Sequence, residues 1–221
     1  MPLLNAKNLT LDEVHQRFRF QRGYCHSFEG LLPLEPLTER ERQEVQQTSR
    51  EFDHHLTSGD TSEGQVKLIA VSPLLRLAGF FRHPLRILVE EGNARIELLD
   101  DDAVITGRFD ILAVHGTQLT EANTPFWVLV IESKGGAISP TVGLPQLLTY
   151  AYRSLEQQQS VWGLVTNGEF YRFVYVESGD LPRYQLLPSL NLTDANSSVQ
   201  LLQVLKAIRQ QSVFSSDSAV A

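Results

Sequence analysis

The feature that most constrains the fold is an apolar run that ends abruptly in charged residues. Residues 126–131 (Phe-Trp-Val-Leu-Val-Ile) are aromatic or aliphatic without a break, and Glu132-Ser133-Lys134 and two glycines follow them. A run this short and this rich in aromatic and β-branched residues predicts a strand buried on both faces of a sheet. Because side chains alternate along a strand, Glu132 and Lys134 share one face and Ser133 points to the other.

A second short strand is predicted over residues 111–114, with Asp110 at its entrance. Residues 115–125, which include Gly, Thr and Asn, would join the two strands as an antiparallel hairpin. If Asp110 lies opposite Glu132, the two Cβ atoms are about 5 Å apart. Two carboxylates and Lys134 at one end of an apolar hairpin form a magnesium-type site, since hard cations take oxygen ligands. The alternative is an internal ion-pair cluster of the same three residues, because buried charges are costly unless they are paired.

The composition limits the classes of protein that this chain can belong to. Its 221 residues, 42% hydrophobic and 20% charged, fit one large domain or one domain with an extension. A net charge of −7 gives no general affinity for polyanions, so any nucleic-acid contact needs a local basic patch. The single cysteine, Cys25, excludes a disulfide framework and a cysteine zinc cluster.

Targeting signals and membrane spans are absent from the sequence pattern. Residues 1–7 lack the apolar core of a signal peptide, and no apolar run approaches the roughly 18 residues that a membrane span requires. We therefore expect a cytoplasmic protein that does not associate with a membrane.

The chain is expected to contain three parts. Residues 1–58 are predicted to be an N-terminal helical extension, since Thr10 with Glu13 and Thr38 with Glu41 have capping-box spacing. The second box opens a very polar helix that would serve as an arm or an interaction surface. Residues 59–190 are predicted to form the core, and residues 191–221 a C-terminal helix, up to about residue 210, with a flexible tail.

Within the core, helices and strands alternate in an α/β order. The first expected elements are a helix over 63–78, capped by Ser62 and broken or bent at Pro73, and a strand hairpin of 85–90 and 94–98 around the turn 91–93. After the hairpin at Asp110, we expect a helix over 145–157 that begins with Pro145, and strands 161–166 and 170–176 around Asn167-Gly168. The acidic stretch 100–102 is interpreted as an exposed turn.

These elements and motifs resemble the PD-(D/E)xK nuclease superfamily. That resemblance implies an α/β, restriction-endonuclease-like core, in which a mixed central β-sheet is flanked by helices. The matching residues are Asp110 for the first acid, Glu132-Ser133-Lys134 for the ExK triplet, Gln146 and Tyr150 for the QxxxY motif of some branches, and Glu63 for a helical glutamate that often precedes the core.

A narrower resemblance covers about residues 60–178. Gly107-Arg108-Phe109-Asp110, the helix motif and residues 164–168 (Leu-Val-Thr-Asn-Gly) are together similar to the N-terminal nuclease domain of type I restriction enzyme motor subunits. Phe109 replaces the superfamily's usual proline, a change that the motor-subunit branch tolerates. The chain contains no GxxxxGK[ST] motif, so neither a nucleotide cofactor nor ATP-driven translocation is expected.

The resemblance also implies a set of site residues. Asp110 and Glu132 would hold one or two Mg²⁺ ions, for which Mn²⁺ can substitute, with help from Glu63 and the Ser133 carbonyl. Lys134 would orient the attacking water or stabilise the transition state. The remaining expected roles are substrate or lysine positioning by Gln146 and Tyr150, and phosphate contacts by Arg108 and Arg153. The plain alternatives are a first-turn helix acid for Glu63, a helix-surface pair for Gln146 and Tyr150, and a solvated charge for Arg153.

Three functions fit this set of residues. The first is a metal-dependent DNA endonuclease of a restriction, defence or repair type, acting as a homodimer or with other restriction subunits. The second is a binding module that keeps the nuclease fold without catalysis. The third is a nuclease that acts on RNA or as one subunit of a restriction complex.

Overall fold

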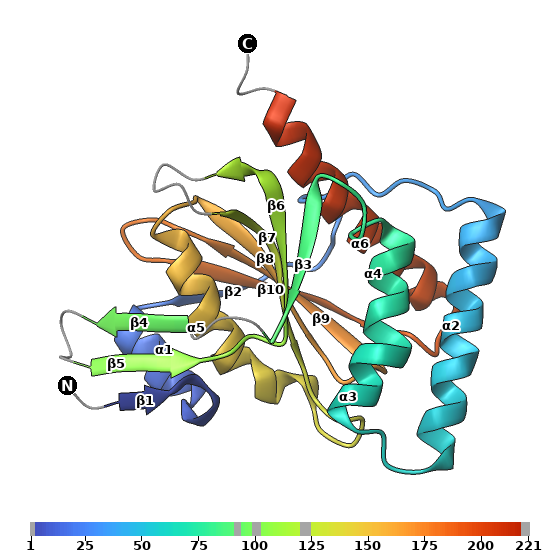
Figure 1. Ribbon diagram of the computed structural model, residues 1–221, viewed down its shortest axis with the longest axis horizontal. Helices are drawn as coiled ribbons and strands as arrows, with labels where there is room; N and C mark the ends of the chain where they lie inside the picture. The colour runs from blue at the N-terminus through green and yellow to red at the C-terminus, as the bar shows by residue number, and fades with distance from the viewer. Residues whose placement is uncertain (1–2, 91–93, 99–102, 120–124, 218–221) are drawn as a thin grey trace.

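The computed structural model describes residues 3–90, 94–98, 103–119 and 125–217. A large mixed β-sheet forms its centre, and helices cover both faces of that sheet (Figure 1). In spatial order, the seven strands are β2 (Gln21–Tyr24), β10 (Arg183–Asn191), β9 (Phe170–Glu177), β8 (Ser160–Thr166), β7 (Pro125–Ser133), β6 (Ile111–Leu119) and β3 (Leu85–Val89). Neighbouring strands are antiparallel except in the pairs β7–β8 and β10–β2.

The apolar run is the central strand β7, as its sequence predicts. Residues Val128 to Ile131 are buried, and the antiparallel partner β6 pairs Ile111 with Ile131. This register brings Asp110 opposite Glu132 at the end of the hairpin. On its other side β7 pairs in parallel with β8, and the connection between them runs through the helices η3 (Pro140–Gly143) and α5 (Leu144–Leu155).

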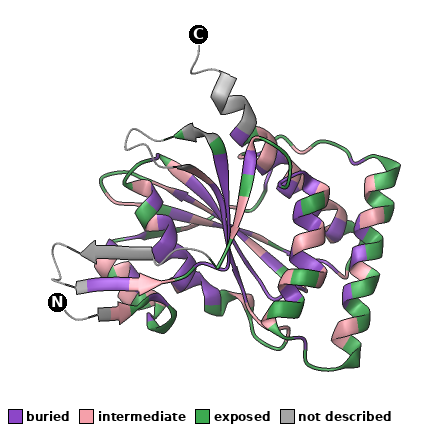
Figure 2. Ribbon diagram, viewed as in Figure 1, coloured by how far each residue is buried: buried purple, intermediate pink, exposed green. Residues whose placement is uncertain are grey.

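Two separate hydrophobic cores lie on the two faces of the sheet. Val130 of β7 packs in the cluster that includes α5 and α1 (Leu11–Phe18). Leu129 and Ile131 pack in the other cluster, under α2 (Glu39–Ser58), α4 (Ser72–Ala78) and α6 (Ala195–Asp217). The alternation of side chains along one buried strand therefore contributes to both cores, and Figure 2 shows the central strands of the sheet as largely buried.

Local capping signals are confirmed where the sequence predicts them. Thr10, Thr38 and Ser62 each form a capping box at the start of α1, α2 and α3 (Glu63–Gln65). After α3, the chain forms a π-helical segment, η2 (Val66–Val71), before α4 begins. The N–H of Ser72 reaches the carbonyl of Lys67, so the helix widens just ahead of Pro73 instead of breaking.

The prediction that residues 1–58 form only a helical extension needs correction. Strand β2 joins the edge of the large sheet beside β10, and β1 (Leu3–Asn5) pairs with β5 (Ala103–Gly107). The polar helix α2 packs by Val45, Thr48 and Phe52 and does not extend as a free arm. These strands escape sequence analysis because their partners lie about a hundred residues or more away, and only tertiary structure brings them together.

The predicted hairpin of residues 85–98 is also wrong. Strand β3 pairs with β6 of the large sheet, whereas β4 (Ala94–Leu98) pairs with β5 in a separate three-stranded sheet of order β1-β5-β4. Leu85 and Ile87 pack in the core under α4, and Glu90 has a φ of 49° where the chain turns away. Burial of the apolar side chains of β3 in the main core thus outweighs the tendency of the following residues to form a hairpin turn. The turn itself, 91–93, and the acidic stretch 100–102 lie outside the described residues.

The end of the chain differs from its prediction in two respects. Helix α6 continues to Asp217, beyond the expected end near residue 210. Strand β10 was not predicted at all; Pro188 lies at an irregularity in its pairing with β9, where a missing N–H is tolerated. No helix in the described ranges is long and apolar enough to cross a membrane.

Candidate active site

Asp110 is fixed at the entrance of β6 by the end of β7. Its Oδ2 accepts a hydrogen bond from the Ser133 N–H at 2.7 Å and another from the Ser133 Oγ at 2.9 Å. Only 4% of Asp110 and none of Ser133 is exposed. The carboxylate is therefore oriented by donors from the neighbouring strand, and its second oxygen, Oδ1, is left to face other groups.

Glu132 is the most deeply buried acid at this strand end. Lys134 Nζ contacts its Oε1 at 2.6 Å, while Oε2 is buried and makes no hydrogen bond among the described residues. Burial and, to a smaller extent, the nearby charge of Asp110 raise the pKa of Glu132, and Lys134 lowers it; together these effects place the pKa at about 8. The carboxylate is thus short of positive charge even with its lysine in place.

Lys67 is a second cation at the site, and the sequence analysis missed it. Its Nζ lies 3.0 Å from Glu63 Oε1, 2.9 Å from Glu90 Oε1 and 3.2 Å from Asp110 Oδ1. Burial opposes its charge, but the hydrogen bond with Glu90 and the charge of Asp110 together raise the pKa of Lys67. Lys67 therefore stays charged and connects the π-helical segment to the strand ends. Its spacing of four residues from Glu63 was the only signal in the sequence.

Gln146 and Tyr150 lie in the first turns of α5 and contact the segment that leads into Asp110. The Tyr150 hydroxyl donates to the Arg108 carbonyl at 2.8 Å, and Gln146 Nε2 lies 3.1 Å from that hydroxyl and 3.3 Å from the same carbonyl. Gly107 allows this approach, since a Cβ there would lie 2.4 Å from the Tyr150 hydroxyl oxygen. Both side chains therefore position the backbone before Asp110.

Replacing Tyr150 by phenylalanine is expected to lower the free energy of unfolding by about 1–2 kcal/mol, because the part-buried Arg108 carbonyl and the buried Gln146 amide each lose one of their partners. Chemical denaturation of the wild type and variant checks this value. Tyr152→Phe, on the same helix, is the matched control and should cost less. Equal losses in the two variants would contradict the positioning role of Tyr150.

Two further features border the carboxylates. A Cβ on Gly143 would lie 2.8 Å from Glu132 Cγ, so η3 packs directly against the glutamate and only glycine fits there. The charge of Lys7, in the short helix η1 (Ala6–Asn8), also acts to lower the pKa of Glu132. The N-terminal residues thus supply a cation near the site, which the expected boundary at residue 58 had separated from it.

The predicted site residues are brought together to different degrees. Asp110, Glu132, Ser133 and Lys134 form one contiguous group, and Glu63 reaches it through Lys67. Arg108 contributes its carbonyl, while the residue as a whole is exposed beside Asp110. Arg153 is exposed in the last turn of α5, about one helical turn beyond Tyr150.

The group of charges at this strand end carries an excess of negative charge. Four carboxylates (Glu63, Glu90, Asp110 and Glu132) and two lysines (Lys67 and Lys134) leave a formal charge of −2 when all are ionised. The unpaired Glu132 Oε2 offers a hard oxygen ligand. Among the described residues, however, no three His, Cys, Asp or Glu side chains are already arranged as a metal-binding group. The Lys67 ammonium contacts three of the four carboxylates instead.

Comparisons with known proteins add little to this geometry. No family model matches the chain, and no curated protein matches it. A solved fragment of a putative HsdR subunit of a type I restriction enzyme from Vibrio vulnificus YJ016 has 20% sequence identity and a TM-score of 0.38. The match covers 65% of this chain and 25% of that one. A TM-score at this level does not establish a common fold, so any functional assignment rests on the site itself.

Proposed function

We propose that this protein is a metal-dependent nuclease that hydrolyses DNA phosphodiester bonds, in a restriction or repair setting. The observation that carries the proposal is the carboxylate pair Asp110 and Glu132, where β6 begins and β7 ends. Glu132 has one oxygen paired with Lys134 and one buried oxygen without a partner. Such an arrangement is unfavourable in an ordinary strand end and fits a place for a cation.

The roles follow from the contacts of each residue. Asp110 and Glu132 would hold Mg²⁺ or Mn²⁺, with the Ser133 carbonyl as a further oxygen. The bound cation would lower the pKa of a coordinated water and offset charge on the scissile phosphate. Lys134, held 2.6 Å from Glu132, would orient that water or donate to the phosphate as it gains charge. Ser133 keeps Asp110 oriented, and Tyr150 and Gln146 fix the backbone before it.

Substrate contacts are proposed for the cations around this group. Arg108 and Lys7 are exposed beside the carboxylates, and phosphates of a nucleic-acid backbone would pair with them without reading its sequence. Arg153 is proposed for a more distant phosphate along α5. Cleavage of both strands of a duplex would need two such sites, from a homodimer or from another restriction subunit.

The test is cleavage of a supercoiled plasmid in Mg²⁺, in Mn²⁺ and in EDTA. Glu132→Gln, purified in the same way, controls for contaminating nucleases. We expect nicking that depends on the metal and is absent from the variant, together with a metal-induced rise in the melting temperature of the wild type. Parallel reactions with single-stranded RNA separate a DNA nuclease from an RNA nuclease. Nicking that is equal in the two proteins would contradict the proposal.

A second function, a binding module without catalysis, is favoured by one observation. Lys67 already contacts Glu63, Glu90 and Asp110, so part of the acidic charge is neutralised without any metal. A protein of this kind would bind DNA or a protein partner at low salt but would neither cleave DNA nor gain stability from Mg²⁺.

A further inference from the structure

A pocket remote from the carboxylate site lies where α2, α4 and α6 meet. It has a volume of about 430 Å³, and none of its lining residues belongs to the carboxylate site. Five of the lining residues are cationic and two are acidic, which gives a local formal charge of +3 in a chain of net charge −7. The cations are Arg40, Arg76, Arg82, Lys206 and Arg209, and the acids are Glu41 and Glu44.

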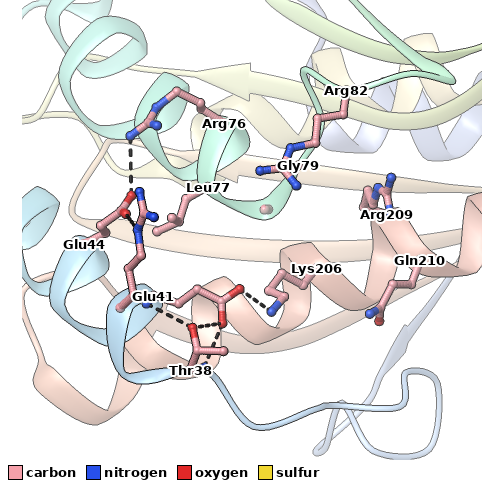
Figure 3. Close-up of a pocket in the computed structure, with 12 residues that line it drawn as sticks. Thr38, Glu41, Glu44, Arg76, Leu77, Gly79, Arg82, Lys206, Arg209 and Gln210 are labelled. Atoms are coloured by element: carbon pink, nitrogen blue, oxygen red, sulfur yellow. Dashed lines mark hydrogen bonds and ion pairs between the residues drawn. The ribbon is translucent and has the colours of Figure 1, made fainter.

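The two halves of the pocket differ in how their charges are satisfied. On one side, Glu44 pairs with Arg40 at 2.8 Å and with Arg76 at 3.7 Å. On the other side are Arg82 and Arg209, and Figure 3 shows both with Lys206 on this side of the cavity. The pocket is therefore electrostatically uneven, with its excess positive charge gathered near α6.

Among the described residues, Arg82 and Arg209 are the two cations of the pocket without a counterion. Within the described ranges, neither guanidinium makes an ion pair or a side-chain hydrogen bond, and the Nε of Arg209 is buried without a partner. Lys206 keeps one carboxylate contact, with Glu41. A buried donor without an acceptor carries an energetic cost that a bound anion would remove.

The turn that follows α4 holds these groups close together. Gly79 ends α4 with a φ of 90°, a left-handed conformation that favours glycine, and Arg82 follows in the same turn. A Cβ on Gly79 would lie 3.7 Å from the Arg209 Nε, so α6 packs against this turn. Two of the last α4 carbonyls, those of Arg76 and Leu75, accept hydrogen bonds from the N–H groups of Gly79 and Phe80.

We propose that this pocket binds the phosphate group of a small phosphomonoester or free phosphate. Two planar guanidinium groups and an ammonium offer several donors to the oxygens of a compact dianion. The non-phosphate part of a ligand would lie along Leu77 and Ala78, the apolar part of the lining.

A small ligand fits the charges better than a nucleic-acid backbone does. A DNA duplex carries a charge about every 1.7 Å of its axis, so it would extend several phosphates beyond Arg82 and Arg209. Glu41 and Glu44 border the pocket on the α2 side and would repel those further phosphates. A single phosphate avoids this repulsion.

The experiment is isothermal titration calorimetry of the full chain with AMP, inorganic phosphate and adenosine, in a phosphate-free buffer that contains EDTA. We expect AMP and phosphate to bind and adenosine not to bind. Arg82→Gln and Arg209→Gln should each weaken AMP binding at least about tenfold, the loss expected for one charge-assisted contact. Arg50→Gln, an exposed change on α2 outside the pocket, should leave it unchanged. Glu44→Gln should strengthen binding, because it frees Arg76 and Arg40.

Three results would overturn the proposal. The first is that neither AMP nor phosphate binds at about 10 mM, a concentration at which any remaining affinity is negligible. The second is that adenosine and AMP bind equally well. The third is that a short DNA duplex displaces AMP and that this displacement depends on Arg82. Arg82 is exposed on a turn, so its variant remains informative even if Arg209→Gln fails to fold. Glu132→Gln should bind AMP like the wild type, which separates this pocket from the proposed nuclease site.

Discussion

Replacing Glu132 by glutamine is expected to lower the rate of metal-dependent DNA cleavage by about a thousandfold or more. Glutamine keeps the shape of the side chain, but it cannot carry the negative charge that holds a cation beside Asp110. The rate is measured as plasmid nicking per unit time at saturating Mg²⁺. Glu51→Gln, an exposed change on α2, is the matched control and should retain the wild-type rate.

The same variant should change how stability depends on pH. The pKa of Glu132 rises from 4.5 to about 8 on folding, so the folded protein holds this proton after the unfolded chain has lost it. Without metal, the stability due to this proton is fully present below pH 4.5 and is lost as the pH rises to about 8. The loss amounts to up to about 5 kcal/mol. In Glu132→Gln this slope should disappear, as urea titrations in EDTA at several pH values would show.

Mg²⁺ should reverse the effect in the wild type, because the cation favours the ionised carboxylate. The metal-induced rise in melting temperature is therefore expected to be larger at pH 8 than at pH 6. Parallel pH profiles for the wild type and Glu132→Gln would be incompatible with a buried, protonated Glu132.

Replacing Lys67 by methionine is expected to lower the free energy of unfolding by about 3 kcal/mol in EDTA. The side chain of Lys67 is only 13% exposed, and its removal leaves Asp110, Glu63 and Glu90 without their shared counterion. Mg²⁺ should recover part of this loss, since a divalent cation can replace the missing charge. Thermal and chemical denaturation with and without the metal measure both effects.

Lys206→Met provides the comparison for Lys67→Met. Lys206 is also largely buried, with a side chain 22% exposed, but among the described residues it contacts a single carboxylate, Glu41. Its replacement should cost less, and Mg²⁺ should not restore the loss. If the two variants lost equal stability and Mg²⁺ stabilised neither of them, the contacts of Lys67 would be ordinary structural ion pairs.

Local sequence was sufficient for the elements whose signals lie within a few residues. The unbroken apolar run before Glu132 predicted the central strand, and the capping boxes of Thr10 and Thr38 predicted two helix starts. The position of Asp110 opposite Glu132 was only a condition in the sequence argument, and the register of β6 with β7 supplies it.

Local sequence did not predict the role of Lys67, the strand β2 or the pairing partner of β3. Lys67 meets Asp110 across 43 residues, and the π-helical segment in which it lies has no reliable sequence pattern. Strand β2 is short and polar, and it forms because its backbone pairs with that of β10 at the edge of the large sheet. For β3, burial of Leu85 in the main core outweighed the turn that follows it.

The sequence by itself thus determined the central hairpin and the acids and lysine at its end. Periodicity and capping act between neighbouring residues, so they are visible without a fold. Only the tertiary structure decided which charges surround those acids, since Lys67, Glu90 and Lys7 come from three segments that are distant in the chain. The free energy of burying a charge depends on all the groups around it, and these groups come together only in the folded chain.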